Sequence, residues 1–461
     1  MKNMTLKNIA TVCGGTYYGS SDLYDKEVSG VTIDSRKIES EYLFIPIRGT
    51  RVDGHTFIPE VMESGALCTL SEEILQDAAY PYILVDSCQS ALQSIAKFYR
   101  QSLDIKVVAI TGSVGKTSTK ESIASVLSTK YKVLKTAGNF NNEIGVPLTV
   151  FNLKEEHEIA VLELGISNFG EMHRLADIAR PDICILTNIG LSHLDTLGSQ
   201  EGILKAKSEI FDFLSKDGHI ILNADDSRLE NLTEVNGVTP HFFSIKKSSH
   251  AFATDIQNLG LDGTSCVLHI KEDSDNEKEL SIPVTIPIPG NHMVYNVLAA
   301  AFTGHLMGLT LSEIKTGIER MPFVSGRTNI IKTDSITIID DCYNANPTSV
   351  RSALDVLASA LGRKVAILGD MFDMGENTNT LHSEIGHYAV NHQIDVICCV
   401  GVLSHNIFEA ASESSDKLVY FFPSKEWLFR ELDSIIEDGD TVLVKASHGM
   451  EFPEIVDRLK S

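Results

Sequence analysis

The residues of this 461-residue chain with the clearest chemical potential form the stretch Gly112-Ser113-Val114-Gly115-Lys116-Thr117-Ser118. It follows the apolar run Val107–Ile110, which we expect to be a buried strand, and it leads into a helix-compatible segment. A glycine turn between a strand and a helix N-terminus points backbone N–H groups at phosphate, and a lysine adds a full positive charge. The stretch predicts an enzyme that uses ATP or a related triphosphate, with the Thr117 hydroxyl offered to Mg²⁺.

The spacing of this loop departs from the usual phosphate-binding loop. Only two residues separate its glycines, where four are usual, and Ile110 stands where the first glycine is expected. The alternative is a glycine-rich turn before a helix, with an exposed lysine. The strand and the helix on either side favour the phosphate-binding interpretation.

Two further side chains follow apolar runs of the same region. Glu163 ends the run Ala-Val-Leu-Glu, and His193 comes soon after the run Ile-Leu-Thr-Asn. A carboxylate at the end of a buried parallel strand lies where open α/β sheets bind ligands, and Mg²⁺ prefers oxygen ligands. Glu163 can instead be a turn carboxylate paired with a surface cation, and a lone histidine is more often structural. Because both follow strands of the sheet that bears the phosphate loop, we favour the metal-binding interpretation.

The segment Asp340-Asp341-Cys342-Tyr343-Asn344-Ala345-Asn346-Pro347 follows another expected strand and places carboxylates, a phenol and two amides in one loop. Such a loop can contact a ribose, an adenine or an amino acid. It is also typical of a helix-capping turn, because Asp and Asn cap helices and Pro begins them. Both interpretations can hold together.

Two other polar segments remain open on pattern alone. Gly138–Pro147, which contains Asn139, Asn141 and Asn142, is a glycine-bounded segment after a strand and is either a substrate loop or an ordinary turn. Lys205 and Lys207 lie in a helical stretch, where lysines are usually solvated.

Composition excludes several classes of function. The net charge of −23, from 39 basic and 62 acidic residues, argues against nucleic acid or an anionic membrane as a partner. Most of the eight cysteines sit in apolar runs and none shows Cys-x-x-Cys spacing, so we expect buried free thiols. The first residues lack the apolar core of a signal peptide, and no apolar run is long enough to span a membrane. We therefore expect a cytoplasmic protein.

The length suits about three domains, and the patterns divide the chain into three α/β parts. Residues 1–104 alternate short strands and helices. Residues 105–321 form a parallel-sheet domain with the phosphate loop, and an antiparallel insertion is expected at about 250–289, around the polar stretch KEDSDNEKE. Residues 322–461 predict a smaller, Rossmann-like doubly wound domain without a phosphate loop of its own.

The individual elements follow from apolar runs and amphipathic stretches. The strands that we expect besides Val107–Ile110 are Val31–Ile33, Tyr42–Ile47, Tyr82–Val85, Tyr131–Leu134, Ile159–Leu164, Ile183–Asn188, His219–Leu222, Ser265–Ile270, Leu280–Ile288, Ile336–Ile339, Lys364–Leu368, Val396–Val400, Leu418–Phe422 and Thr441–Val444. The principal helices that we expect are Leu6–Cys13, Phe57–Ser64, Ser90–Gln101, Glu171–Ala179, Gln200–Leu214 and Val297–Met307.

Taken in order, these segments resemble the Mur ligase family over nearly the whole chain, and the short phosphate loop is the form that this family uses. The resemblance is carried by Thr111–Thr117, Asn139–Pro147, Glu163–Gly165, Asn188–Asp195, Ala206–Phe211, Gly290–Ala300, Gly326-Arg327, Asp340–Pro347, Leu368–Glu376 and Lys445–Glu451. The Tyr-Asn-Ala-Asn segment at 343–346 is similar to the members that join D-alanyl-D-alanine to UDP-N-acetylmuramoyl-tripeptide in peptidoglycan synthesis. The Asp-Asn-Pro-Arg motif of the diaminopimelate-adding members is absent.

The resemblance implies an ADP-forming amide ligase that uses ATP and Mg²⁺ and works through an acyl phosphate. Its small-molecule substrates would be UDP-N-acetylmuramoyl-tripeptide and D-Ala-D-Ala, and the enzyme would be a monomer. The first domain would bind the UDP-sugar, the central domain ATP, and the third the incoming dipeptide. Two alternatives remain: another amino-acid ligase on the same scaffold, such as a diaminopimelate- or lysine-adding enzyme or a folylpolyglutamate synthase, and a nucleotide-binding protein without catalysis.

The family's roles transfer to matching positions of this chain. Lys116 would hold the β- and γ-phosphates, Thr117, Glu163 and His193 would hold magnesium, and Lys207 matches the lysine that the family carries as a carbamate. Nucleotide contacts would come from Gly112–Ser118, Asn296, Arg327 and Asp341. Substrate contacts would come from Ser35, Arg36, Asn139, Asn141, Asn142, Tyr343, Asn344 and Asn346.

Two positions depart from the family pattern. Met293 replaces an amide in Gly290-Asn291-His292-Met293-Val294-Tyr295-Asn296, which puts one nucleotide contact in doubt. His448 replaces an arginine in Lys445-Ala446-Ser447-His448, so a cation that meets a substrate carboxylate would depend on pH.

Overall fold

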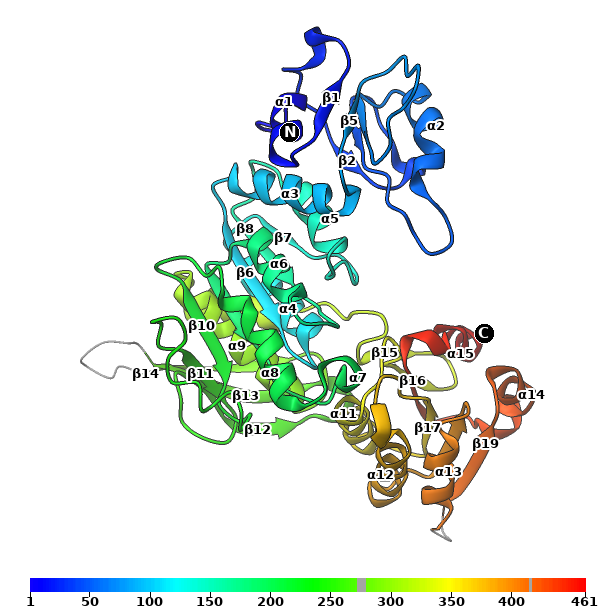
Figure 1. Cartoon of the computed structure of the whole chain (residues 1–461). Coiled ribbons are helices and arrows are strands. Elements are labelled where there is room, and N and C mark those ends of the chain that lie inside the picture. The colour runs from blue at the N-terminus through cyan, green and yellow to red at the C-terminus, as the bar shows by residue number, and fades with distance from the viewer. Residues whose placement is uncertain (272–278, 414–416) are drawn as a thin grey trace. The chain divides into compact units, whose positions relative to one another are not determined.

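The computed structural model describes residues 1–271, 279–413 and 417–461, and Figure 1 shows its helices and strands. The strands form a five-stranded, a nine-stranded and a six-stranded sheet, and helices accompany each sheet. The α/β class is confirmed. Among the helices of the described residues, none combines the length and the apolar character that a membrane span needs. All eight cysteines lie in the described ranges and are free thiols.

The N-terminal sheet has the order β1-β5-β4-β3-β2, in which only the edge strand β1 is antiparallel to its neighbour. Its strands are β1 (Thr16–Tyr18), β2 (Val31–Thr32), β3 (Leu43–Phe44), β4 (Cys68–Ser71) and β5 (Tyr82–Leu84), and its helices are α1 (Leu6–Val12), α2 (Ile58–Glu63) and α3 (Cys88–Gln101). Phe44 packs against Ile58 and Val61 of α2 in the core of this part. The pattern analysis found β2, β3 and β5 and missed β1 and β4.

The nine-stranded sheet has the order β14-β13-β12-β11-β10-β9-β6-β8-β7. Its strands are β6 (Lys106–Thr111), β7 (Val133–Lys135), β8 (Ile159–Glu163), β9 (Ile183–Leu186), β10 (His219–Asn223), β11 (His241–Ser244), β12 (Ala251–Asn258), β13 (Thr264–Lys271) and β14 (Glu279–Ile286). Strands β12 to β14 pair antiparallel, which confirms the antiparallel insertion. The polar stretch expected inside it falls mostly on residues 272–278, outside the described residues.

The helices between these strands or directly after them are α4 (Lys116–Leu127), α5 (Gly145–Phe151), α6 (Glu171–Ala179), α7 (Leu194–Leu197), α8 (Gln200–Ser208), α9 (His292–Leu306) and α10 (Leu311–Glu319). Two predicted helices differ from the observed bounds by more than two residues. The helix expected over Gln200–Leu214 ends as α8 at Ser208 and is followed by a 3₁₀ turn, Glu209–Phe211. The helix expected from Val297 begins five residues earlier, at His292.

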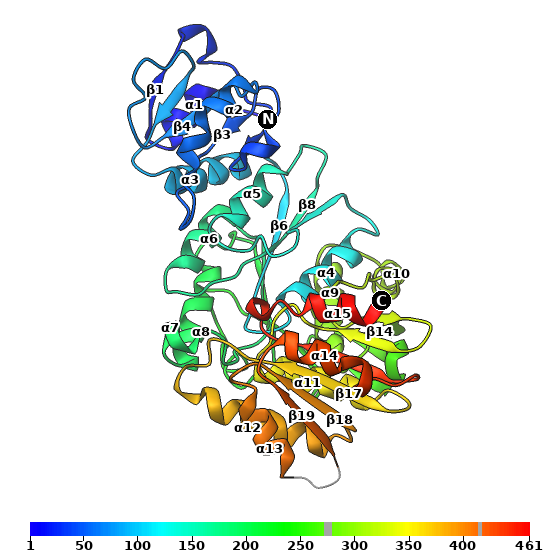
Figure 2. The same ribbon diagram turned by 90° about the vertical axis from the view of Figure 1, so that its right-hand side faces the viewer.

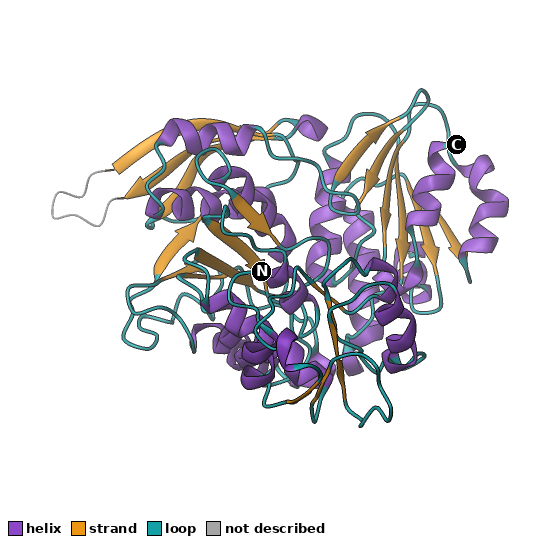
Figure 3. Cartoon of the chain, turned by 90° about the horizontal axis from the view of Figure 1, so that it is seen from above, coloured by secondary structure: helices purple, strands orange, loops and turns teal. Residues whose placement is uncertain are grey.

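The C-terminal sheet has the order β15-β16-β20-β17-β18-β19, parallel except for the edge strand β15. Its strands are β15 (Asn329–Lys332), β16 (Thr337–Asp340), β17 (Lys364–Gly369), β18 (Val396–Val400), β19 (Leu418–Phe422) and β20 (Thr441–Lys445). Its helices are α11 (Pro347–Ala358), α12 (Thr378–Asn391), α13 (His405–Ser412), α14 (Lys425–Ile435) and α15 (Pro453–Lys460). Figures 2 and 3 show helices on both sides of this sheet. Two apolar cores, one beneath α11 to α13 and one beneath α14 and α15, confirm the doubly wound prediction.

The chain divides into two compact units. The first comprises residues 1–110, 131–184 and 208–219, and the second comprises 111–130, 185–207 and 220–461. The phosphate loop, His193, Lys207 and the whole C-terminal sheet belong to the second unit. The domain limits expected at residues 104 and 321 remain a prediction.

Candidate nucleotide site

The predicted phosphate loop joins the end of β6 to the beginning of α4, as expected. Gly112 and Gly115 adopt φ of 149° and 81°, and Gly115 is the N-terminal cap of α4. A Cβ at Gly112 would lie 1.9 Å from the Thr187 hydroxyl oxygen, so no larger residue fits there. The backbone N–H groups at this end of α4 are the donors that a phosphate needs.

The loop is held from the end of β9 by two residues that pattern analysis did not single out. The Asn188 side chain accepts a hydrogen bond from Val114 N at 2.9 Å and donates one to Val114 O at 3.0 Å. The Thr187 hydroxyl also donates to Val114 O, at 2.7 Å. The only sequence signal for this support is a polar pair directly after an apolar strand.

Replacing Gly112 with alanine should abolish MgATP binding, because the methyl group collides with Thr187 and the loop must shift. Titration calorimetry with an unreactive ATP analogue checks this. Gly439→Ala is the matched control, since Gly439 also has positive φ, 91°, but nothing lies within 4 Å of its Cβ position. The control should lose only about 1–2 kcal/mol of stability through backbone strain. Analogue affinity in Gly112→Ala within threefold of wild type would contradict the loop assignment.

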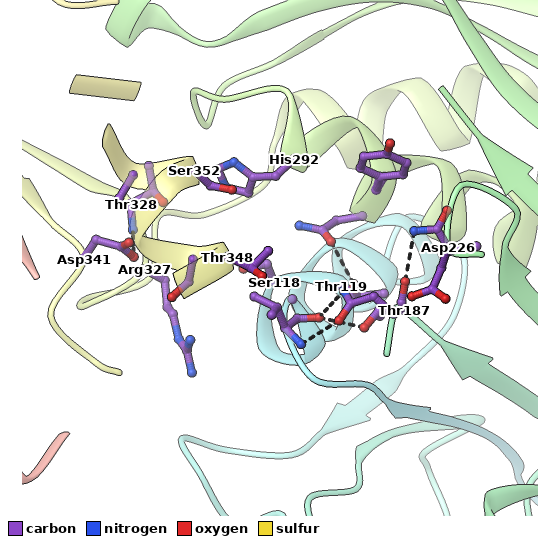
Figure 4. A pocket seen from close by; sticks show the side chains of 18 of the residues that line it. Ser118, Thr119, Thr187, Asp226, His292, Arg327, Thr328, Asp341, Thr348 and Ser352 are labelled. Atoms are coloured by element: carbon purple, nitrogen blue, oxygen red, sulfur yellow. Dashed lines mark hydrogen bonds between the residues drawn. The ribbon is translucent and has the colours of Figure 1, made fainter. Parts of the chain in front are cut away.

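A cavity of about 300 Å³ opens beside the loop, and all of its lining residues belong to the second unit (Figure 4). It brings together six residues singled out for the nucleotide: Val114, Gly115, Ser118, Asn296, Arg327 and Asp341. The pattern analysis gave no nucleotide role to other lining residues, among them Thr119, Thr187, Asn188, Asn223, Asp225, Asp226, Phe243, His292, Tyr295 and Lys445. The cavity therefore joins the phosphate loop to residues far along the chain.

One wall of the cavity combines an aromatic surface with fixed polar groups. Phe243 and Tyr295 line it, and their ring centroids are 6.4 Å apart. Burial, together with the nearby Asp225 carboxylate, raises the pKa of Tyr295. The same carboxylate accepts hydrogen bonds from the Ser244 hydroxyl at 2.6 Å and from Ile245 N at 2.9 Å. Such a wall suits a flat heterocycle with polar edges.

Asn296 is oriented from two sides although the family's second amide is missing. Its Oδ1 accepts a hydrogen bond from the Thr119 hydroxyl at 3.0 Å. Its Nδ2 lies 3.2 Å from the sulfur of Met293, which is buried beside it. The Met293 sulfur thus serves as a weak acceptor for Asn296. The substitution of the family's amide by Met293 removes one expected nucleotide contact but leaves Asn296 in place.

The opposite wall holds Arg327 and Asp341. The Arg327 guanidinium lies 3.9 Å from the Tyr343 ring centroid, and its Nη2 donates to the Thr117 hydroxyl at 3.4 Å. Asp341 accepts from Thr328 N at 3.0 Å and from Lys445 Nζ at 2.6 Å. Arg327 reaches the phosphate loop while its guanidinium stays stacked on Tyr343. A fixed positive charge therefore stands where an anion bound by the loop would lie.

Three basic side chains share one neighbourhood by the phosphate loop. Lys116 Nζ donates to Gly112 O at 2.8 Å. Burial, assisted by the charge of Lys116, lowers the pKa of Lys207 well below its ordinary value. Burial, followed by the charges of Lys207 and Lys116, lowers the pKa of His193. Each positive charge in this cluster makes a second one less favourable. An anion bound among these side chains would offset that repulsion.

Lys207 and Lys205 differ in burial although they lie two residues apart. Lys205 is exposed, as expected of a solvated lysine, whereas only 1% of Lys207 is exposed. In the described part of the chain, no carboxylate pairs with Lys207. The solvated interpretation, which sequence physics alone favoured, is wrong for Lys207.

Glu163, in the first unit, ends the buried strand β8 and is 2% exposed. The Asn141 side-chain nitrogen donates to its Oε1 at 2.8 Å. The Asn142 side chain accepts from Ile144 N and Gly145 N, and Asn139 O accepts from Asn141 N. The segment is thus a tight turn that also presents Asn141 to Glu163. The alternative of a surface carboxylate in a turn is wrong for Glu163.

The remaining substrate candidates have local structural roles. Asn346 caps α11 reciprocally with Ser349, which confirms the capping interpretation of this loop. Its Nδ2 also reaches the Ser192 hydroxyl at 3.4 Å. Asn344 O accepts from Lys445 Nζ at 3.1 Å. Ser35 and Arg36 lie in a 3₁₀ turn, Ser35–Lys37, where Arg36 forms a bidentate pair with Asp34.

Family models match three consecutive parts of the chain. They are the Mur ligase family, catalytic domain, over residues 27–100, the Mur ligase middle domain over 110–304, and the Mur ligase, glutamate ligase domain over 326–448. The chain is also 37% identical to the UDP-N-acetylmuramoyl-tripeptide–D-alanyl-D-alanine ligase of Bacillus subtilis (strain 168), with 100% of this chain and 99% of that protein covered. This chain belongs to the Mur ligase family.

Solved structures of Mur ligases have the same architecture. MurF from Acinetobacter baumannii is 29% identical and superposes with a TM-score of 0.88 over 99% of this chain and 98% of that one. The MurF ligase from Thermotoga maritima in complex with ADP is 26% identical, with a TM-score of 0.82 over 94% and 97%. The three-domain α/β prediction is confirmed, and as a Mur ligase the chain is an ATP-dependent, ADP-forming amide ligase.

The donor set expected for magnesium is chemically suitable. Thr117 offers a hydroxyl and Glu163, in the first unit, a buried carboxylate; burial lowers the pKa of His193, which favours the uncharged imidazole that can ligate a metal. Among the described residues, no group of three or more His, Cys, Asp or Glu side chains is placed to hold a metal alone. Mg²⁺ in nucleotide enzymes needs only one or two protein groups, because phosphates and water complete its shell. The residues therefore fit a phosphate-bound ion.

Proposed function

We propose that this Mur ligase joins D-alanyl-D-alanine to UDP-N-acetylmuramoyl-tripeptide, with cleavage of ATP to ADP and phosphate. The observation that carries the proposal is the full-length similarity to the Bacillus subtilis ligase of that name. The Tyr-Asn-Ala-Asn loop at 343–346 and the cavity beside the phosphate loop support it. Residues 1–104 would bind the UDP-sugar, 105–321 the ATP and 322–461 the dipeptide, in a monomeric enzyme.

The reaction begins when the terminal carboxylate of the tripeptide attacks the γ-phosphorus of ATP, which gives an acyl phosphate and ADP. Negative charge on the transferring group is offset by the backbone N–H groups of the loop, by Lys116 and by Arg327. The dipeptide amine then attacks the acyl carbon, phosphate leaves and an amide forms. The γ-phosphate would lie by the loop, and the adenine beside Phe243 and Tyr295.

Thr117, Glu163 and His193 would hold magnesium, whose chemistry here is to neutralise phosphate charge. Lys207 would carry a carbamate, which supplies an anion at the place where an ammonium would oppose the metal. Its burial and lowered pKa support this, because only an uncharged amine reacts with carbon dioxide.

The test is phosphate release measured with each substrate omitted in turn. We expect release to require UDP-tripeptide, D-Ala-D-Ala, ATP and Mg²⁺ together, and mass spectrometry should find the UDP-pentapeptide. A mixture of acceptors, with diaminopimelate, lysine and glutamate beside the dipeptide, identifies the amine used. Release that ignores the dipeptide, or product formed with another acceptor, would overturn the proposal.

A further inference from the structure

Asp340 is a buried carboxylate to which the proposed function gives no part. It ends β16 and is 3% exposed. In the described part of the chain, no lysine, arginine or histidine forms an ion pair with it. Removing a carboxylate from water is costly unless hydrogen-bond donors replace the water. The donors that surround Asp340 therefore indicate which part of the molecule it holds.

Asp340 holds the turn that leads into Arg327. Its Oδ2 accepts hydrogen bonds from Gly326 N at 2.8 Å and from the Ser325 hydroxyl at 3.2 Å. Its Oδ1 accepts from the Cys342 thiol at 3.0 Å. Burial, followed by the hydrogen bond to Asp340, raises the pKa of Cys342, so this donor stays a neutral thiol. The short bond from a main-chain N–H to a carboxylate therefore fixes the residue directly before Arg327.

The residues on either side of Arg327 have unusual backbone conformations. Gly326 adopts φ of 73°, and a Cβ there would lie 3.0 Å from the nearest side chain. Thr328 adopts φ of 49°, which is strained for a β-branched residue. Two consecutive carboxylates hold this strained stretch, because Asp340 accepts from the residue before Arg327 and Asp341 accepts from Thr328 N at 3.0 Å (Figure 4). The main chain is thus held on both sides of Arg327.

The Arg327 side chain that this turn presents is fixed, and it retains a donor. Its guanidinium lies 3.9 Å from the Tyr343 ring centroid, and its Nη2 reaches the Thr117 hydroxyl at 3.4 Å. Its Nε is buried and donates no hydrogen bond to any described residue. A buried donor without an acceptor is costly, and an anion bound at the phosphate loop would supply one. The turn therefore brings an oriented cation to that loop.

We propose that Asp340 is a positioning residue for phosphoryl transfer, which fixes Gly326 so that the Arg327 guanidinium meets the γ-phosphate of ATP. This rests on the proposed function, in which Arg327 offsets negative charge on the transferring group. Asp340 acts through the main chain and not by contact with a substrate. A fixed charge stabilises a transition state only at the right place, and a misplacement of about 1 Å can lower a rate about 10²-fold.

The test is a double-mutant cycle in which kcat is measured as phosphate release under saturating substrates. Arg327→Ala should lower kcat about 10³-fold, the scale of one preorganised charge. Asp340→Ala should lower kcat about 10²-fold and leave the KM for the dipeptide little changed, since the turn moves but the guanidinium remains. In the Arg327→Ala background, Asp340→Ala should lower kcat at most about twofold further, because the group that Asp340 positions is gone.

Asp340→Asn tests the same contact with a smaller change. The amide oxygen can still accept from Gly326 N but carries no charge, so kcat should fall about tenfold, and in the Arg327→Ala background it should not change. Asp440→Ala is the matched control, because Asp440 is a 1% exposed carboxylate of the same domain that accepts from Glu437 N at 2.8 Å, just before β20. The control should lower the melting temperature and leave kcat unchanged.

A kcat of Asp340→Ala equal to that of wild type, or a further loss of about 10²-fold in the Arg327→Ala background, would overturn the proposal. Should Asp340→Ala fail to fold, Asp340→Asn decides: no loss of kcat, or an equal loss in both backgrounds, would overturn the proposal. An unchanged kcat in Arg327→Ala would remove Arg327 from the proposed function and this proposal with it. If the wild type used an acceptor other than D-Ala-D-Ala, the proposed function would fail, and the same cycle with that acceptor would still test Asp340.

Discussion

Alanine at position 116 should lower kcat by about 10³-fold, the scale of removing one preorganised charge from a transition state. Lys116 Nζ lies 2.8 Å from Gly112 O, so its ammonium is held over the loop that should cradle the β- and γ-phosphates. The charge of the transferring group is largest in the transition state, and we therefore expect kcat to fall more than the KM for ATP rises. Phosphate release under saturating substrates measures the change.

Two comparisons make this result specific. Lys116→Arg keeps the positive charge and should recover part of kcat, whereas a purely steric role would give equal losses in both variants. The melting temperatures of both should stay near that of wild type, because Lys116 is partly exposed at a helix end rather than part of the core. Turnover of Lys116→Ala within threefold of wild type would mean that the phosphate loop is wrongly assigned.

The parts of this molecule that sequence predicted well are those whose signal is local. The strand β6, the glycine turn and α4 form one continuous pattern, and the apolar strands of the C-terminal domain were found within two residues of their ends. The helix α10 was missed although its signal is local too, since Thr310 and Glu313 form a capping box. The edge strand β15 was also missed; it is partly buried and ends at the exposed Lys332, so it lacks the continuous apolar run of the central strands.

The supports of the site were missed because they depend on contacts between distant segments. Thr187 and Asn188 meet Val114 only through the register of two strands that lie more than 70 residues apart in the chain. Lys207 shows the same limit. Its burial depends on what packs around α8, and no spacing within the helix distinguishes it from the exposed Lys205. For Lys207 residue type misled about burial, and the carbamate that the family resemblance implies stays a prediction.

Alanine at position 207 should lower kcat about 10²- to 10³-fold, and the pattern of rescue should identify the missing group. If Lys207 carries a carbamate, acetate or formate diffusing into the vacated space should restore part of the activity. Methylammonium, which replaces an ordinary lysine, should restore none. The opposite pattern would show that Lys207 acts as a cation. Lys205→Ala is the matched control and should retain normal kcat, because Lys205 is exposed on the same helix.

The pH dependence of this modification follows from the lowered pKa of Lys207. Burial and the charge of Lys116 lower the pKa of its amine well below that of an exposed lysine, which favours the uncharged form. Carbon dioxide adds to the uncharged amine and releases a proton, so falling pH reverses the reaction. In carbon dioxide-depleted buffer we expect activity to decline toward low pH, and added bicarbonate should move this decline to lower pH. With ¹³C-bicarbonate, wild type and Lys205→Ala should give a carbamate signal by NMR that Lys207→Ala lacks, because Lys207 is buried with a lowered pKa beside the charge of Lys116 whereas Lys205 is exposed.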